Sequence, residues 1–580
     1  MSCGHGVKLL PSLSTGTDTV FTSGWASARM TSAMHDTTDS PTRSLQPEGR
    51  TFHRLIFGSA LYRFSLRGRR PDHIRVVVPI SWPENRTTVE ALLEGNFEFH
   101  GRRYPLGRAP WLAVAQNPTV AAALHSFSWL GDLRALGSKA AQLRARHLVE
   151  DWIENNSRWS MPAWAPAVLG RRVSAWLTAA DFLLTSANEP FPPRFYGSIA
   201  TQARHLRRVA GSTGGTADAF SAGKGMLLSA LCLGIGKPEA ALKFLCREAD
   251  RQILPDGGHV QRCPALHLDV MRDLLDIRST LNAARIEVPA SLLGGIDRMA
   301  PMLRALRLGD GSLALFHGGK EGDRRLLDAV LARSGVKSKA LDNGRHVGFQ
   351  RLAAGRTIIV LDAGAPPSVH DDQLGHAAPL SFEMSVGRDR LVVNCGSFAG
   401  DDREWRDAMR SADAHSTLIV KDTSVSEIRP DGRLAIRPIE VAAERRESEG
   451  SVWVEATHDG YRRPFGVVHA RRLYLHESGD DIRGEDRLDG PGRDPFKVRF
   501  HLHPAVKATA DGEPATVLLT LPGGAGWRFI AAGGIVSLEE SVYLGASDMP
   551  KRSTQIVIAG APKEDSAEVK WAFQREDVGE

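Results

Sequence analysis

The first group of residues that could do chemistry is a histidine-containing turn. Asp256-Gly257-Gly258 predicts a tight turn, and Pro264 is well placed as the first residue of the helix that follows. His267 would then lie in the first helical turn, where the helix dipole favours a neutral imidazole and nearby anions. His259 and Arg262 flank the same turn. These three are candidate site residues, although the two histidines could equally serve only to hydrogen-bond the loop.

The second group contains two histidines and an asparagine that are far apart in the sequence. His376 precedes one apolar run, Asn394 follows the run Leu391–Val393, and His415 precedes another. Adjacent strands could bring these side chains together, and two imidazoles with one oxygen ligand would suit zinc with an open position. Asn carries no charge and is a weak zinc ligand, so ordinary hydrogen bonds are the alternative. The resulting prediction is a zinc or other divalent metal at His376, Asn394 and His415.

Two smaller groups have a less specific pattern. Arg499, His501 and His503 alternate along an expected strand and would share one face. We interpret that face as solvent-exposed. Trp159 and Trp164 lie in a polar stretch between expected helices, where an indole could stack on a sugar or pack in the core. We take both tryptophans as candidate substrate-binding residues.

Two kinds of sequence must position these groups. Up to about residue 331 apolar residues recur at helical spacing, as in Ala141–Ile153. After about Gly344 short β-branched runs alternate with turns such as Asp489-Gly490. We therefore expect an α-helical domain over residues 51–343 and an antiparallel β-sandwich over residues 344–580, with a pocket at their interface. Residues 1–50 are rich in Ser, Thr, Gly and Asp and are expected to form a disordered leader.

Composition excludes several classes of function. The 580 residues include 73 Lys plus Arg and 67 Asp plus Glu, a net charge of +6 without a basic stripe, so nucleic acid is not an expected partner. No apolar run is long enough to span a membrane. The absence of a phosphate loop or GxGxxG motif argues against a nucleotide cofactor. The five cysteines lack metal or disulfide spacing. No signal peptide is visible, which by sequence alone indicates the cytoplasm.

The order of the motifs resembles the bacterial heparinase II/III family of polysaccharide lyases. The resemblance covers roughly residues 50 to 560. It implies an incomplete (α/α) toroid followed by an antiparallel β-sandwich, a cleft for an acidic, uronic-acid-containing glycan, and the periplasm or cell envelope as location. The motifs that carry it are Asp256 to His259 with Arg262, Pro264 and His267, then His376 with Leu380 to Glu383, and then Arg410-Ser411 with Ala414-His415.

The chain departs from the family pattern at several positions. The family usually has a Tyr, serving as base and acid, at the position of Leu266, and a second His at the position of Leu374. Ala378 and Asn394 each replace an Asp, and the usual Asn-His pair near residues 214–222 is absent from Gly214–Asp218. The departures concern the chemistry more than the fold.

The resemblance implies cleavage by β-elimination. A proton is removed from the carbon next to the uronate carboxylate, and the glycosidic oxygen then leaves. This reaction needs a cation on the carboxylate, a base and an acid. We predict His267 or His376 as the proton carrier, with His259 beside them, and Arg262 and Arg410 as the residues that hold the uronate.

Two other functions stay open. The departures at Leu266 and Leu374 would suit a catalytically degenerate glycan-binding or cell-envelope protein that keeps the cleft. A metal-dependent hydrolase that uses His376 and His415 is a third hypothesis. The expected partner of the chain is an anionic polysaccharide. The 59 arginines against 14 lysines suit such a partner, because the guanidinium fork binds carboxylates and sulfates through two hydrogen bonds, although genome composition explains most of this excess.

Overall fold

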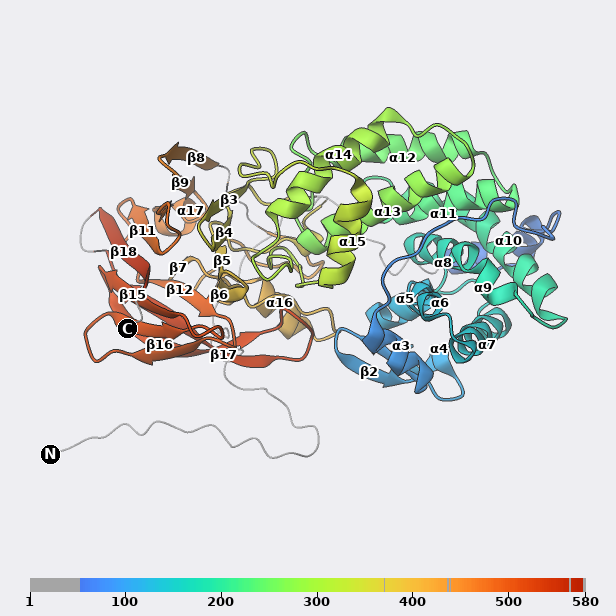
Figure 1. Cartoon of the computed structure of the whole chain (residues 1–580), viewed down its shortest axis with the longest axis horizontal. Coiled ribbons are helices and arrows are strands. Elements are labelled where there is room, and N and C mark those ends of the chain that lie inside the picture. The colour runs from blue at the N-terminus through green and yellow to red at the C-terminus, as the bar shows by residue number, and fades with distance from the viewer. Residues whose placement is uncertain (1–52, 370, 436–437, 439, 563–564, 577–580) are drawn as a thin grey trace. The chain divides into compact units, whose positions relative to one another are not determined.

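Helices make up the chain from α2 (Ala60–Ser65) to α15 (Arg324–Ser334), interrupted by one hairpin of β1 (Asn96–Phe99) and β2 (Arg102–Pro105), as the blue-to-green ribbon of Figure 1 shows. The computed structural model describes residues 53–369, 371–435, 438, 440–562 and 565–576. The other helices of this part are α3 (Arg86–Leu93), α4 (Pro110–Ala113), α5 (Pro118–Ser126), α6 (Leu130–Leu136), α7 (Lys139–Asn155), α8 (Pro166–Thr178), α9 (Ala180–Leu184), α10 (Phe191–Val209), α11 (Asp218–Leu233), α12 (Pro238–Gln252), α13 (Pro264–Ala283) and α14 (Ala290–Ala305).

Helix α7 shows how the apolar spacing becomes structure. Its N-cap Ser138 accepts a hydrogen bond from the backbone N–H of Ala141, which satisfies one of the free donors at the helix start. The apolar side chains at helical spacing, among them Leu148 and Trp152, are buried on one face. The helix predicted over Ala141–Ile153 is therefore confirmed, and its apolar face is part of the helical core.

Glycines allow α8 and α11 to approach closely. A Cβ atom at Gly170 would lie 2.5 Å from the carbonyl oxygen of Ser221, and one at Gly225 would lie 2.8 Å from the carbonyl oxygen of Gly170. Neither position has room for a side chain, so the two helix backbones pack directly against each other.

The second half of the described chain consists of two eight-stranded antiparallel sheets. In spatial order the first contains β13 (Lys507–Ala510), β14 (Thr516–Thr520), β15 (Gly526–Ala532), β18 (Ser566–Arg575), β11 (Asp481–Asp489), β10 (Val468–Leu475), β9 (Ser451–His458) and β8 (Val441–Ser448). The second contains β16 (Ile535–Tyr543), β17 (Lys551–Gly560), β12 (Phe496–Leu502), β6 (Asp389–Val393), β5 (Phe382–Val386), β4 (Thr357–Asp362) and β3 (Phe349–Ala354), and β7 (Leu418–Val420) pairs with β12. Two short helices, α16 (Arg403–Arg410) and α17 (Arg462–Phe465), lie in the connections.

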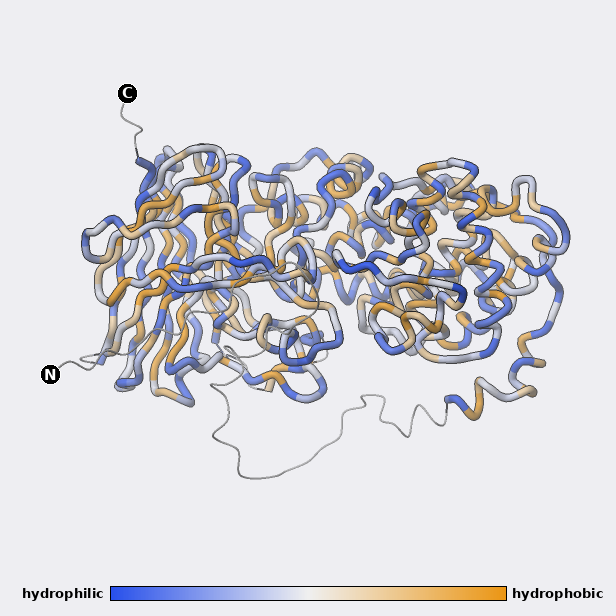
Figure 2. The backbone as a smooth tube through the Cα atoms, turned by 90° about the horizontal axis from the view of Figure 1, so that it is seen from below, coloured by the Kyte–Doolittle hydropathy of each residue, from blue (hydrophilic) through white to orange (hydrophobic). Residues whose placement is uncertain are grey.

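The two sheets share one hydrophobic core. Phe382 of β5 stacks on Trp571 of β18, with ring centroids 5.6 Å apart, and Phe500 of β12 meets the same indole edge-on. Along β9 and β11 buried residues alternate with more exposed ones, as expected for strands that are covered on one face. Figure 2 shows the same mixture of hydrophobic and hydrophilic segments along the strands.

The sequence-based interpretation of Arg499 and His501 as surface residues is wrong. Their exposed fractions are 8% and 1%. Strand β12 pairs with β17 on one side and with β6 and β7 on the other, so it lies inside the sheet. His501 hydrogen-bonds the hydroxyl of Ser541 at 2.7 Å and the carbonyl of Asp413 at 2.9 Å. Regular alternation identifies a shared face, but not whether that face is covered.

The segment after α14 runs along the second sheet and fastens to it. The backbone N–H of Leu315 donates to the buried carboxylate of Glu383 on β5 at 2.9 Å. Further along, the ammonium of Lys320 donates to the carbonyl oxygens of Ser397 and Leu544 and to the carboxylate of Asp548. Lys320 therefore connects two loops of the sandwich that are about 150 residues apart in the chain.

The predicted fold class, helices followed by an antiparallel sandwich, is confirmed. Helix α15 ends at Ser334 and β3 begins at Phe349, whereas the exact division at residues 343 and 344 stays a prediction. The leader predicted for residues 1–50 lies outside the described residues. None of the helices in the described ranges combines the length and the apolarity that crossing a bilayer requires. The four cysteines in those ranges are free thiols.

Candidate functional site

His259 and His267 lie near each other, as the sequence predicts, but both are buried. His259 forms a hydrogen bond to the side-chain oxygen of Gln252 at 3.2 Å and accepts one from the backbone N–H of Gln261 at 3.2 Å. His267, in the first turn of α13, donates to the carbonyl of Met299 at 3.0 Å. Burial lowers the pKa of His259 to about 3 and that of His267 to about 4. Both rings are therefore neutral at pH 7, mainly because they are buried.

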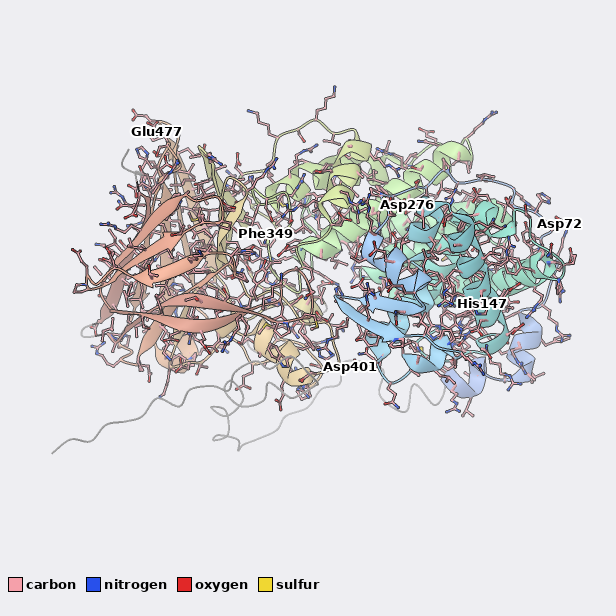
Figure 3. All side chains as sticks on the ribbon, turned by 60° about the horizontal axis from the view of Figure 1, so that its bottom comes forward. Asp72, His147, Asp276, Phe349, Asp401 and Glu477 are labelled. Carbon is pink, nitrogen blue, oxygen red and sulfur yellow. The ribbon has the colours of Figure 1, made fainter. Side chains whose placement is uncertain are left out.

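Arg262 uses its whole guanidinium inside the protein. It forms an ion pair with Asp362 at the end of β4 and donates to the carbonyl oxygens of Val347 and Ala365, at 2.6 and 2.9 Å. Its guanidinium also lies over the ring of Phe349, 5.0 Å from the centroid; Phe349 is labelled in Figure 3. The predicted uronate-binding arginine thus joins the turn before α13 to the first strands of the sandwich.

His317 and Asp362 are site residues that the sequence motifs did not indicate. The Nε2–H of His317 donates to the second carboxylate oxygen of Asp362 at 2.8 Å, and both side chains are buried. The Nδ1 of His317 accepts from the backbone N–H of His376 at 3.1 Å. An Asp at the end of an apolar strand was the available signal for one partner, but nothing in the loop around His317 distinguishes that histidine.

His376 and His415 are brought together, as predicted, and hydrogen-bond each other. The Nε2 of His376 accepts from the backbone N–H of Gly318 at 2.8 Å, so its Nδ1 carries the proton and donates to Nε2 of His415 at 2.7 Å. The Nδ1–H of His415 in turn donates to the carbonyl of Ser411 at 2.6 Å. A backbone N–H can only donate, so this chain has one consistent direction, and each ring is neutral with both nitrogens occupied.

Electrostatics agree with this assignment of protons. Burial lowers the pKa of His415 to about 4, and burial together with the neighbouring His415 lowers that of His376 well below its usual value. Burial also lowers the pKa of His317, although Asp362 acts in the opposite direction. Protonating any of these rings at neutral pH would break a hydrogen bond and place a charge in the interior.

The predicted metal ligands are a poor fit for zinc in this arrangement. The facing nitrogens of His376 and His415 share a hydrogen bond, and the side chain of Asn394 accepts from the N–H of Ser416 at 3.0 Å and donates to the carbonyl of Leu315 at 3.1 Å. Within the described ranges no three His, Cys, Asp or Glu side chains gather in a geometry that could hold a metal ion. The metal stays a prediction.

Arg410, the second predicted uronate ligand, also binds backbone. Its guanidinium donates to the carbonyl oxygens of Gly375, Gly432 and Asp372, at 2.6, 2.7 and 3.2 Å. These contacts fix the loop that leads into His376. Arg410 therefore positions the histidine segment and has no free fork for a ligand.

The two candidate tryptophans lie elsewhere, in the helical core. Trp164 is 4% exposed and donates its indole N–H to the carbonyl of Asn156 at 3.0 Å. Trp159 is half-buried and packs beside Phe57, with ring centroids 5.7 Å apart. Neither tryptophan contacts the histidine network. The sequence left open whether Trp164 binds a sugar or packs in the core, and in the structure it packs in the core.

The observed network runs from the turn of His259 through Arg262, Asp362 and His317 to His376 and His415. It connects the helical part to the sandwich by buried hydrogen bonds. His267 is not part of this network, and its Nδ1 is buried without a hydrogen-bond partner in the described structure. As arranged, the network can hold two parts of the protein in register, but it presents no proton carrier to solvent.

The chain combines a helical toroid with a β-sandwich of two antiparallel sheets, and the buried network joins these two parts. A family model described as heparinase II/III-like, C-terminal matches residues 336–572. The chain belongs to the heparinase II/III family.

Solved structures and a curated relative resemble the chain over most of its length. A heparinase III structure has 12% identity and a TM-score of 0.69, covering 92% of both chains. A mutant of the heparan sulfate lyase HepC from Pedobacter heparinus has 16% identity and a TM-score of 0.59, covering 92% of this chain and 90% of that one. FtsZ-localized protein C of Caulobacter vibrioides is 31% identical over 546 residues, covering 90% of this chain and 93% of that protein.

Proposed function

We propose that this chain is a binding protein built on the heparinase fold, and that it does not cleave glycans. The observation that carries the proposal is the hydrogen-bonded pair of His376 and His415. Both ring nitrogens of each histidine are occupied by partners inside the protein. A general acid or base must reach the substrate with a free nitrogen or proton, and neither ring offers one.

The other requirements of β-elimination point the same way. Arg262 and Arg410, the predicted cations for the uronate carboxylate, are bound to Asp362 and to backbone carbonyls. His267 is about 1% exposed, and Leu266 stands where the family resemblance leads us to expect a tyrosine. β-Elimination needs a cation for the carboxylate, a base and an acid. The arginines and histidines that could supply them are buried and bonded inside the protein, and the expected tyrosine is absent.

The name of the relative supports a role in cell division. FtsZ-localized protein C shares 31% identity with this chain across nearly all of both proteins. We infer that this chain likewise acts where FtsZ assembles, with the heparinase fold serving as a scaffold for binding. An anionic polysaccharide remains the ligand that the fold family suggests, and it stays a prediction.

A direct assay separates this proposal from the lyase hypothesis. Purified protein is incubated with a panel of uronic-acid polymers, and unsaturated ends are followed by ultraviolet absorbance, with an active heparinase III as the positive control. We expect no product from this chain on any polymer. A rise in absorbance that His376→Ala or His267→Ala abolishes would overturn the proposal and establish the lyase instead.

Binding is measured on the same protein. A glycan array and co-sedimentation with FtsZ filaments report the two classes of ligand separately. Retention of the chain on FtsZ filaments or on an anionic glycan, without cleavage, is the expected result. Failure of both would leave no binding function and would contradict the proposal.

A further inference from the structure

A pocket of about 340 Å³ on the helical part of the chain has an arginine-rich wall. It lies between residues 65–75 and the C-terminal ends of α10 and α11. Asp72, which is labelled in Figure 3, belongs to its rim. We call it the arginine pocket, after the six arginines that line it: Arg67, Arg69, Arg75, Arg204, Arg207 and Arg208.

The protein offsets little of the positive charge of the arginine pocket, since Asp72, which interacts with the charge of Arg69, is the acid among its lining residues. Across the described residues, none of the six guanidinium groups forms an ion pair with a carboxylate. Asp72 is the single acid of the lining, and its carboxylate faces His73 at 2.6 Å. Burial and the neighbouring charge of Arg207 lower the pKa of Arg204. Like charges held this close repel one another, which favours binding of a multiply charged anion.

Two of the arginines build the wall of the pocket. Arg204 donates to the carbonyl of Leu66 at 3.1 Å, and Arg208 donates to the carbonyl and hydroxyl oxygens of Ser65 at 2.9 and 2.8 Å. These bonds hold the segment after α2 against α10. The wall is therefore a fixed surface.

Three other arginines keep their donors available. The side chains of Arg69, Arg75 and Arg207 are exposed and make no hydrogen bond or ion pair within the described part of the chain. The guanidinium of Arg75 lies over Gly234, where a Cβ atom would come within 2.4 Å of it. Gly234 has a φ of +66° and ends α11, so a glycine here both completes the helix and leaves room for the guanidinium.

Helix capping does not account for this arrangement. Arg207 and Arg208 lie in the last turn of α10, where a positive charge is favourable. Arg67, Arg69 and Arg75, however, come from the segment that precedes α3, more than 120 residues earlier in the chain. Their convergence on the same hollow requires a different explanation.

We propose that the arginine pocket binds a phosphate group of a phosphorylated ligand. A phosphate monoester carries a charge of about −1.5 to −2 at pH 7 and three acceptor oxygens, which match several guanidinium forks at once. A uronate carboxylate carries one charge, and a sugar ring separates it from the next. The volume lies at the lower end of the range of small-molecule sites, about 300–1,000 Å³. The proposal is independent of the proposed scaffold role.

Calorimetric titration of the full chain with inorganic pyrophosphate tests the site. The triple variant Arg69→Ala/Arg75→Ala/Arg207→Ala should lower the affinity by about a hundredfold, because each lost arginine removes a charge-assisted hydrogen bond. The control Arg108→Ala/Arg345→Ala/Arg388→Ala removes the same charge from exposed positions outside the pocket and should change affinity less than about threefold. An equal loss in both variants, or no binding by any phosphate probe, would overturn the proposal.

Two further measurements, with lipid vesicles and with a heparin oligosaccharide, identify what carries the phosphate. Flotation with vesicles of phosphatidylglycerol in phosphatidylcholine, against phosphatidylcholine alone, reports phosphate carried on a lipid. Binding of pyrophosphate without binding of vesicles would identify a free phosphorylated ligand. Binding of vesicles that the pocket variant loses would identify a lipid headgroup. Both outcomes support a phosphate site. Binding of a heparin oligosaccharide that the pocket variant loses, with no binding of either phosphate probe, would contradict it.

Discussion

Arg262 and Asp362 form a buried ion pair that joins the turn before α13 to the end of β4. Their side chains are 5% and 3% exposed. Burial alone would raise the pKa of Asp362, but the charge of Arg262 and the hydrogen bond from His317 outweigh it and hold that pKa well below its usual value. The carboxylate is therefore ionised at neutral pH, and it is the centre from which the network extends.

Replacing that carboxylate should destabilise the protein strongly. Asp362→Asn leaves the guanidinium of Arg262 buried without its counter-charge, a change that costs about 3–5 kcal/mol. We expect a large fall in the urea midpoint, measured by circular dichroism. Asp481→Asn is the control: it removes one partner of the ion pair with Arg483, whose side chain is 63% exposed, and should cost less than about 1 kcal/mol. Equal shifts in the two variants would contradict the role given to Asp362.

The buried histidines predict loss of stability in acid. Burial lowers the folded pKa of His415 to about 4, whereas an unfolded histidine titrates near 6.5. The contribution of this neutral ring is fully present above pH 6.5 and is lost as the pH falls toward 4, because the unfolded chain takes up the proton first. Each pH unit in this window should lower the unfolding free energy by about 1.4 kcal/mol for one such histidine.

Denaturation midpoints between pH 7 and 4 measure this effect. His415→Gln removes one of the titrating rings, so its stability should fall less steeply with acid, whatever its stability at pH 7. His346→Gln, at an exposed position, is the matched control and should keep the steep dependence. An unchanged slope in His415→Gln would show that this ring is not protected from protonation.

Gly348 lies where two backbones touch beside Arg262. It has a φ of +85°, and a Cβ atom there would meet the Cα of Gly364 at 2.2 Å. Gly348→Ala should therefore add a backbone overlap to the cost of a left-handed residue, which is about 1–2 kcal/mol. Gly335 ends α15 with a φ of +76° and open space around it, so Gly335→Ala carries the backbone cost alone. Thermal midpoints should fall clearly further for Gly348→Ala; equal falls would disprove the close contact.

Much of the fold could be predicted because its signals are local. Helical spacing located α7, and Pro264 marked the start of α13, since each depends on residues within a few turns. The proximity of His376 and His415 was also predicted, although through adjacent strands, whereas both residues lie in the loops that follow the turns Asp372–Leu374 and Ala412–Ala414. Their burial was not predicted, because it depends on which elements cover these loops.

The role of Arg262 shows why the site was harder. Sequence motifs identify an arginine beside a histidine, and the family resemblance assigns it to a uronate. Its actual partner, Asp362, lies 100 residues away at the end of an apolar strand, and nothing in the sequence pairs the two residues. A guanidinium serves equally well as a ligand clamp or as a structural bracket, and only the tertiary structure decides between them.

Lys320 has a consequence for how the sandwich depends on its surroundings. Its ammonium occupies a ring of oxygens from Ser397, Leu544, Ser547 and Asp548, the kind of surrounding that a dissolved cation would also fill. A dissolved ion exchanges with the medium and can be withdrawn by a chelator. An ammonium that is tethered to its own chain cannot be withdrawn in this way, so this junction does not depend on a cation from the medium.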